Sequence, residues 1–365
     1  MGFKCGIVGL PNVGKSTLFN ALTKTASAQA ANFPFCTIEP NVGDVAVPDA
    51  RLDALADIAQ STNRIPARLS FVDIAGLVRG ASKGEGLGNQ FLGNIREVDA
   101  IAHVLRCFED DDITHVEGTI DPLADADTVE TELMLADLES LEKRESNLRK
   151  KAAAKDKDAL AELELVDLAL VELREGRPAR VADVPQGRER DWKNLQLITS
   201  KPVIYVCNVE EDSAEGGNSL SAKVAEKAAA ENAEAVVISA RIEEELAQLD
   251  DAERLEYLQT LGLEEPGLNR LIRQGYALLD LITYFTAGPN ESRAWTIKRG
   301  TAAPQAAGVI HTDFERGFIK AETIAYGDYT EHQGEQGARD AGRLRQEGKE
   351  YIVEDGDVML FRFNV

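Results

Sequence analysis

One octapeptide near the N-terminus constrains this chain more than any other feature. Residues 9–16 read Gly-Leu-Pro-Asn-Val-Gly-Lys-Ser and fit the pattern G-x-x-x-x-G-K-[ST]. The apolar run Phe3 to Val8 precedes this loop, and a helical pattern from Thr17 to Leu22 follows it. Glycines let such a loop turn its backbone N–H groups toward phosphate oxygens, and the following helix adds the positive end of its dipole. We therefore expect a strand–loop–helix unit that binds a nucleotide.

The residue types within this loop predict separate roles. Lys15 places a cation at the β- and γ-phosphates and should stabilise charge in the transition state of phosphoryl transfer. The Ser16 hydroxyl is a candidate Mg²⁺ ligand. The rest of the predicted phosphate-binding set consists of Asn12, Val13, Gly14 and Thr17.

A second motif, Asp73-Ile74-Ala75-Gly76, ends the apolar run that begins at Leu69. An acid at the tip of a strand beside the phosphate loop can hold Mg²⁺ through water, and the Gly76 N–H can contact a γ-phosphate. Thr37 lies between the two motifs and is predicted to complete the Mg²⁺ ligands with Ser16 and Asp73. The glycine-rich residues 79–88 that follow predict a switch segment ordered by nucleotide.

Leu77 occupies the position where Ras-like proteins carry a water-orienting glutamine. A leucine side chain can neither orient nor deprotonate water. Two alternatives stay open at this point: a partner or another residue supplies the missing group, or backbone and cations hold the water. The predicted catalytic set is thus Lys15, Gly76 and Leu77, with slow intrinsic turnover.

The base-binding motif departs from the usual N-K-x-D of regulatory GTPases. Here Asn208-Val209-Glu210-Glu211 follows the strand candidate Val203 to Cys207, so a valine replaces the lysine and a glutamate replaces the aspartate. The longer carboxylate no longer fits the two N–H donors of guanine, and adenine lacks both donors. The motif favours ATP over GTP, or weak discrimination between them. Ser239 and Ala240 form a second predicted base-side loop.

The order of apolar runs predicts three modules. Runs at 69–74, 100–108, 203–207 and 235–238 alternate with helical stretches, which is typical of a doubly wound, mostly parallel α/β sheet. From Thr128 to Trp192 no strand candidate occurs. Two leucine-rich seams flank a polar tip at 150–158 and predict a helical hairpin or short coiled coil. The seam residues are Met134, Leu138, Leu141 and Leu148, then Leu163, Val166, Leu170 and Leu173.

Residues 279–365 have a different character and predict a small α+β domain. Short β-like runs occur at 293–298, 317–325 and 358–363, with a helical pattern at 338–347. The expected organisation is a nucleotide domain of residues 1–127 and 194–278. It is split by the helical insert 128–193 and followed by the C-terminal domain 279–365.

Charge limits the partners that the whole surface can bind. The chain carries 63 Asp and Glu against 40 Lys and Arg, a formal net charge of −23, which argues against nucleic-acid binding by the surface as a whole. From Ser140 to Arg180, however, ten Lys and Arg meet nine Asp and Glu. This near-neutral segment fits a solvated helix surface, or a ridge that contacts RNA or an acidic partner.

Cysteine spacing and hydropathy add exclusions. The four cysteines, at positions 5, 36, 107 and 207, form no CxxC pair, which argues against a zinc ribbon and a disulfide scaffold. The start lacks the apolar run of a signal peptide, and no stretch approaches the roughly 18 apolar residues of a transmembrane helix. We expect a cytoplasmic protein without a membrane partner.

Together, residues 9–16, 32–41, 73–76, 208–211 and 239–240 resemble the Obg-related P-loop proteins, and specifically the YchF-type, Obg-like ATPase family. The resemblance covers essentially the whole chain. It implies a C-terminal TGS domain of β-grasp, ubiquitin-like form, ATP hydrolysis with Mg²⁺, and association with ribosomes. RNA contact through the insert and the TGS-like domain is a further expectation. The alternatives are a guanine-specific regulatory GTPase, or an adaptor for RNA or protein in which the nucleotide is a structural ligand.

Overall fold

The computed structural model describes residues 3–30, 42–74, 87–110 and 120–364, which separate into two compact units. The first contains Met1–Gly43 and Ser70–Leu271, and the second contains Asp44–Leu69 and Ile272–Val365. The sequence placed residues 44–69 in the nucleotide domain. The structure instead groups them with the C-terminal unit, because Asn63–Ile65 (β3) pairs with Glu291–Lys298 (β9).

One six-stranded sheet has the order β2-β4-β1-β5-β6-β7, and β1, β5, β6 and β7 belong wholly to the first unit. Its pairings β4–β1, β1–β5, β5–β6 and β6–β7 are all parallel, as expected for a doubly wound fold. Every residue of β5 and β6 is buried, which explains why these two strands are mostly apolar, although His103, Arg106 and Asn208 are buried with them. The strands are Val42–Ala46 (β2), Arg68–Asp73 (β4), Lys4–Val8 (β1), Ala100–Arg106 (β5), Val203–Asn208 (β6) and Glu234–Ile238 (β7).

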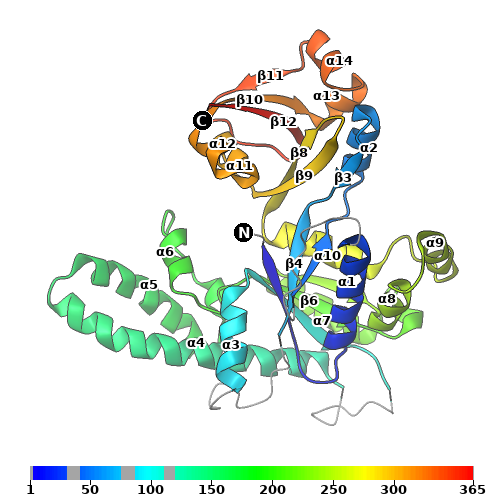
Figure 1. The fold of residues 1–365 in the computed structure, drawn as a ribbon. Coiled ribbons are helices and arrows are strands. Elements are labelled where there is room, and N and C mark those ends of the chain that lie inside the picture. The colour runs from blue at the N-terminus through cyan, green and yellow to red at the C-terminus, as the bar shows by residue number, and fades with distance from the viewer. Residues whose placement is uncertain (1–2, 31–41, 75–86, 111–119, 365) are drawn as a thin grey trace. The chain divides into compact units, whose positions relative to one another are not determined.

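Helices alternate with these strands along the chain (Figure 1). They are Lys15–Ala30 (α1), Leu87–Glu97 (α3), Ser219–Ala230 (α7), Ala240–Leu246 (α8), Asp251–Thr260 (α9) and Gly267–Leu278 (α10). The boundary between the two units falls within α10. In the described part of the chain, no helix has the length and apolar character that crossing a membrane requires.

The predicted helical insert is a hairpin of Pro122–Ala153 (α4) and Lys157–Arg174 (α5), drawn side by side in Figure 1. Asp121 and Asp156 cap the N-termini of the two helices through backbone N–H groups, and Lys155 makes the turn with φ of 65°. All eight predicted seam residues lie in or against one hydrophobic cluster. The short helix Glu189–Asn194 (α6) follows, with Trp192 against the same cluster.

The second unit has a mixed sheet with the order β11-β10-β12-β8-β9-β3. Its other strands are Arg345–Glu347 (β11), Phe318–Ala325 (β10), Asp357–Phe363 (β12) and Leu281–Ala287 (β8). Strands β8 and β9 form an antiparallel pair, whereas β12 lies parallel to β8. The helices are Ala50–Ala59 (α2), Ala303–Ile310 (α11), Thr312–Arg316 (α12), Tyr326–Glu331 (α13) and Glu335–Asp340 (α14).

One predicted element of this unit is wrong. The sequence suggested a helix at 338–347, but α14 ends at Asp340 and Arg345–Glu347 pairs antiparallel with β10. Gly342 adopts φ of 71°, and the Arg343 N–H donates to Ala338 O, which closes the helix end. The helical pattern in the sequence therefore extends beyond α14 and includes a turn and the edge strand β11.

Candidate functional site

The phosphate-binding loop joins β1 to α1. Its backbone conformation and close contacts explain why glycine occupies two of its positions. Gly14 has φ of 97° and Asn12 has φ of 64°, values that glycine and asparagine tolerate best. A Cβ atom at Gly9 would lie 2.4 Å from Val104 O on the neighbouring strand β5. The helix begins at Lys15, so its first backbone N–H groups face the loop that the sequence predicted.

Lys15 is buried to 7 % exposure, and its Nζ donates to Leu10 O at 2.6 Å. Burial lowers the pKa of Lys15 to about 8, while the negative charge of Asp73 opposes this shift. Asp73 ends β4 and pairs in register with Ile7 of β1. Burial raises the pKa of Asp73 and Lys15 lowers it in part. These two groups place one cation and one carboxylate at the same end of the sheet.

The predicted Mg²⁺ and catalytic residues are only partly described. Ser16 is exposed in the first turn of α1, and Asp73 is partly buried. Thr37, Gly76 and Leu77 lie outside the described residues. Ser16 and Asp73 offer a hydroxyl and a carboxylate oxygen, the hard oxygen ligands that Mg²⁺ prefers. The donor set of the described residues therefore fits this ion.

Asn208 ties the phosphate loop to the base-side loop. Its Nδ2 donates to Val13 O at 3.0 Å, and its Oδ1 accepts from Ala240 N at 2.9 Å. The side chain is buried, so both bonds are shielded from water. A Cβ atom on Gly14 would lie 2.2 Å from Asn208 Nδ2, which explains the second glycine of the loop. The Asn208 amide thus links its own loop after β6 to the phosphate loop and to the loop at Ala240.

A cavity of about 630 Å³ opens beside these loops. Among the predicted site residues, its lining includes Asn12, Gly14, Thr17, Asn208, Val209, Glu211, Ser239 and Ala240. Val13, Lys15 and Ser16 do not line it. Six lining residues are not among the predicted site residues, although Glu210 and Arg241 lie within or directly beside the predicted base motifs: Phe108, Glu109, Asp110, Glu210, Arg241 and Glu244.

A sequence signal did exist for Phe108, since it ends the predicted apolar run 100–108. The carboxyl end of β5 lies between those of β1 and β6, where ligands bind in open α/β sheets. The buried Arg106 holds this end, because its Nε donates to Phe108 O at 3.2 Å and its guanidinium lies 4.6 Å from the Phe108 ring centroid. Nothing in the sequence indicates that the Arg241 and Glu211 side chains form an ion pair.

The end of the cavity where the sequence predicts the base to bind is acidic, and two of its carboxylates have partners in the chain. Arg241 Nε lies 2.9 Å from Glu211 Oε1. Glu210 accepts from Ser213 Oγ at 2.8 Å and from Asn218 Nδ2 at 3.1 Å. Burial raises the pKa of Glu210, but these bonds and a backbone N–H lower it below its usual range. Such carboxylates can accept hydrogen bonds from an exocyclic amino group.

Comparisons with known proteins cover the whole chain. The model described as "50S ribosome-binding GTPase" matches residues 4–136, and the C-terminal model of YchF GTPases, described as "Protein of unknown function (DUF933)", matches residues 281–364. The chain is 59 % identical to a "Ribosome-binding ATPase YchF" of Haemophilus influenzae and 53 % identical to that of Bacillus subtilis, with all of each chain covered.

A solved structure gives the same result. The YchF GTPase of Schizosaccharomyces pombe is 40 % identical, with a TM-score of 0.89 and 99 % of this chain and 98 % of that chain covered. A GTP-binding protein of Pyrococcus horikoshii, 19 % identical with a TM-score of 0.64, shares the fold. Full-length identity, both domain models and the fold all agree, and the chain belongs to the YchF family.

Proposed function

We propose that this chain is a Mg²⁺-dependent ATPase that works as a nucleotide-controlled switch on ribosomes. One observation carries the choice of base: the glutamate in the base motif is paired with a cation of the same chain. Glu211 meets Arg241 at 2.9 Å, and Val209 is 3 % exposed with no ammonium to place over a base. Guanine readout needs a free carboxylate of the right length, so this corner selects against GTP.

The relatives' names support the ribosome and ATPase parts of the proposal. Those of H. influenzae and B. subtilis are named ribosome-binding ATPases, and one matching family model is described as a 50S ribosome-binding GTPase. Ribosome association in turn favours a cytoplasmic location. The three described cysteines, Cys5, Cys107 and Cys207, are free and buried, which is compatible with a reducing compartment.

The chain's own groups account for the proposed chemistry. On binding, Lys15 Nζ would exchange Leu10 O for phosphate oxygens, and its burial would strengthen its attraction for them. Ser16 and Asp73, with Thr37, would hold Mg²⁺, which neutralises phosphate charge when bound. Because Leu77 has no polar group to orient water, we propose slow intrinsic turnover, with Gly76 N–H contacting the γ-phosphate.

We also infer that the second unit is a TGS-like β-grasp domain. Its strands β8 and β9 form a hairpin, and β12 returns parallel to β8. Helix α11 lies between β9 and β10 in the chain, and its Ala303, Ala306 and Ala307 are fully buried in the core of this unit. A mixed sheet with a helix packed against it supports the β-grasp form that the resemblance implies.

Calorimetric titration with ATP and with GTP tests the choice of base. We expect tighter binding of ATP by the natural chain and a shift toward GTP in the double variant Val209→Lys, Glu211→Asp. Glu244→Asp is the matched control, because it shortens another carboxylate of the same cavity and should leave the preference unchanged. A clear GTP preference of the natural chain would contradict the proposal and support a guanine-specific GTPase.

Ribosome cosedimentation tests the switch. We expect association that depends on the bound nucleotide and hydrolysis that rises when ribosomes are present. If Lys15→Ala abolished hydrolysis but left ribosome binding and its nucleotide dependence unchanged, the chain would be an adaptor in which the nucleotide has a structural role.

A further inference from the structure

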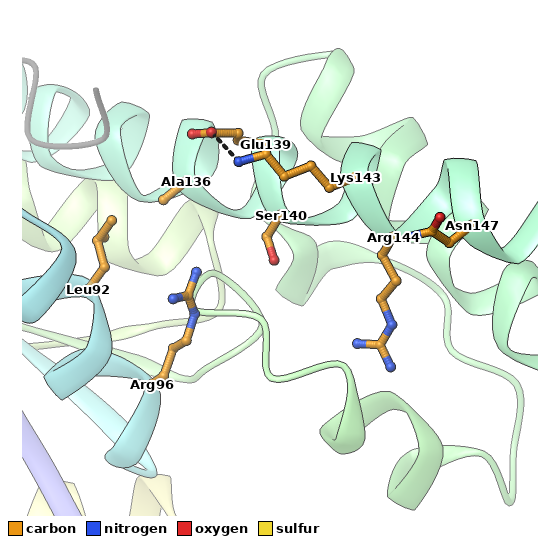
Figure 2. A pocket seen from close by; sticks show the side chains of 8 residues that line it. All are labelled: Leu92, Arg96, Ala136, Glu139, Ser140, Lys143, Arg144 and Asn147. Carbon is orange, nitrogen blue, oxygen red and sulfur yellow. Dashed lines mark hydrogen bonds and ion pairs between the residues drawn. The ribbon is translucent and has the colours of Figure 1, made fainter. Parts of the chain in front are cut away.

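Most charged side chains of the second cavity have partners of opposite charge. This cavity, of about 510 Å³, lies between α3 and α4, and we call it the α3–α4 groove. Its lining includes Arg96 of α3 with Glu139, Lys143, Arg144 and Asn147 of α4 (Figure 2). Lys143 Nζ lies 2.6 Å from Glu139 Oε1, and Arg144 Nε is paired with Glu162 of α5. A cluster in the second unit differs, because two of its three side chains have no such partner among the described residues.

This α13 cluster consists of Asp328 and Glu331 of α13 and of His332, the residue that ends the helix. The two carboxylates and the imidazole each offer one ligand atom, and these atoms lie within 4.8 Å of one another. The spacing i, i+3, i+4 places the three side chains on one face of a helical turn. Ligand atoms about 2.1 Å from one ion stand roughly 3–3.5 Å apart, so small side-chain rotations bring all three to the same ion.

The α13 cluster holds more negative charge than its surroundings neutralise. In the part of the chain that the structure describes, the Glu331 and His332 side chains form no hydrogen bond or ion pair. Asp328 has a cation nearby, since Arg343 Nε lies 3.6 Å from its Oδ1, but the Arg343 side chain is 60 % exposed. An ion pair at that distance and exposure contributes little. Two neighbouring carboxylates and an imidazole therefore face one another without a firmly held cation.

The backbone beneath these side chains is held by packing and hydrogen bonds. Tyr329 is 5 % exposed and anchors α13, and its carbonyl oxygen accepts from Gly334 N at 2.8 Å. Gln333 and Gly334 have φ of 54° and 112°, so the chain turns sharply after His332. A Cβ atom at Gly337 of α14 would lie 1.9 Å from His332 O. Because this backbone is already placed, an ion has to order only three side chains, which lowers the cost of binding.

We propose that Asp328, Glu331 and His332 form a binding site for a divalent transition-metal ion, and specifically for Zn²⁺. An imidazole nitrogen with carboxylate oxygens suits Zn²⁺, whereas Mg²⁺ and Ca²⁺ take oxygen ligands. The cluster contains no thiolate, which argues against Cu⁺ and against a structural zinc site built from cysteines. Three protein ligands leave the fourth position of a tetrahedral ion for water.

Zn²⁺ at the α13 cluster would stabilise the second unit, because the ion binds the folded arrangement and not the unfolded chain. It would join the first turn of α13 to the residue that ends the helix. The following turn packs near α2, since a Cβ atom at Gly334 would lie 3.4 Å from Ile58. The inference goes beyond the proposed ATPase function, because the cluster shares no residue with the predicted Mg²⁺ ligands Ser16, Thr37 and Asp73.

Calorimetric titration of the full-length, nucleotide-free chain with Zn²⁺ tests the site, without a histidine tag and with excess Mg²⁺ to fill hard oxygen sites. We expect one saturable Zn²⁺ that raises the thermal unfolding midpoint, and at least about tenfold weaker binding in Glu331→Gln and in His332→Ala. Glu331 is exposed, so its change leaves the fold intact. His311→Ala is the matched control and should keep the natural affinity, because that exposed imidazole lies 3.4 Å from Asp313 but belongs to no three-ligand group of described residues.

Arg343→Gln gives a test that loss of folding cannot imitate. The change removes the cation that competes for Asp328, so we expect Zn²⁺ to bind several-fold more tightly. Arg339→Gln is its control and should change Zn²⁺ affinity less, because Arg339 pairs with Glu335 at 2.6 Å instead. Equal Zn²⁺ affinity in the natural chain, Glu331→Gln and His332→Ala would overturn the proposal. Zn²⁺ binding that is lost in Cys36→Ser would also overturn it, since the ion would then be bound by a thiolate elsewhere.

Discussion

Cations lie beside the nucleotide cavity and in the α3–α4 groove, but their surroundings differ. Beside the nucleotide cavity, Lys15 is buried and donates to Leu10 O, and the buried amide of Asn208 joins the neighbouring loops. In the groove, the cations lie on helix faces, and Lys143 keeps 74 % of its side chain exposed. Buried hydrogen bonds join the loops beside the cavity, whereas Lys143 of the groove is exposed.

Burial alone does not distinguish Lys15, the proposed catalytic lysine, from other lysines. Lys201 also has a pKa that burial lowers to about 8, but its Nζ donates to the carbonyl oxygens of Arg96, at 2.8 Å, and Val98. Lys201 therefore holds the end of α3, and Lys15 lies in the phosphate loop. Position relative to strand ends, rather than the pKa shift, separates a functional group from a structural one.

The sharpest test of the comparison is Lys15→Ala. We expect ATP hydrolysis to fall by about 100-fold or more, because the variant loses a buried cation at the transferred phosphate. Lys201→Ala is the control, since it removes an equally shifted lysine away from the phosphate loop and should lower stability rather than chemistry. Steady-state hydrolysis with thermal unfolding distinguishes the two. Equal losses of hydrolysis in both variants would contradict a functional role for Lys15 that Lys201 does not share.

Asn208→Ala should show how far the cavity depends on one side chain. The change leaves Val13 O and Ala240 N without their partner, at a cost of about 2 kcal/mol in the free energy of unfolding. Denaturant unfolding measures this cost, and calorimetry should show weaker ATP binding. The corresponding groove variant, Asn147→Ala, changes an exposed residue and should leave stability nearly unchanged. Similar costs for both variants would contradict the contrast between buried hydrogen bonds beside the cavity and exposed side chains in the groove.

The pKa of Lys15 predicts opposite effects of pH on binding and stability. Phosphate binds the protonated form, so ATP affinity should be level below about pH 8 and fall above it. The folded pKa lies below the unfolded value of 10.5, so the unfolded state binds more protons between these values and stability from this group rises with pH. Titrations from pH 7 to 9.5 check the first effect. If ATP affinity still fell above about pH 8 in Lys15→Met, a group other than Lys15 would cause the fall.

The smallest effect is expected for Lys143→Gln in the groove. This lysine pairs with Glu139 at 2.6 Å, but both side chains are more than half exposed, and such pairs add little to stability. Thermal unfolding of the variant and of the natural chain should therefore give midpoints that do not differ measurably. A clear loss of stability would mean that the groove is a structural charge network.

Local patterns predicted much of the first unit. The glycine spacing fixed the loop between β1 and α1, and apolar runs located β4, β5, β6 and β7. The leucine seams located the hairpin of α4 and α5 because helix periodicity is a short-range property. Periodicity misled at 338–347, where Gly342 ends a helix and the following residues form an edge strand.

The sequence by itself determined the phosphate loop, the strand ends that carry Asp73 and Asn208, and the altered base motif. Only the tertiary structure decided that residues 44–69 join the second unit through β3 and β9, and that Arg241 forms an ion pair with Glu211. It also decided that Arg96 and Arg144 share a groove. The reason is physical: helices and strands repeat over a few residues, so the spacing of apolar residues in the sequence reveals them. Pairings between distant segments depend on how whole elements pack, and no local pattern records them.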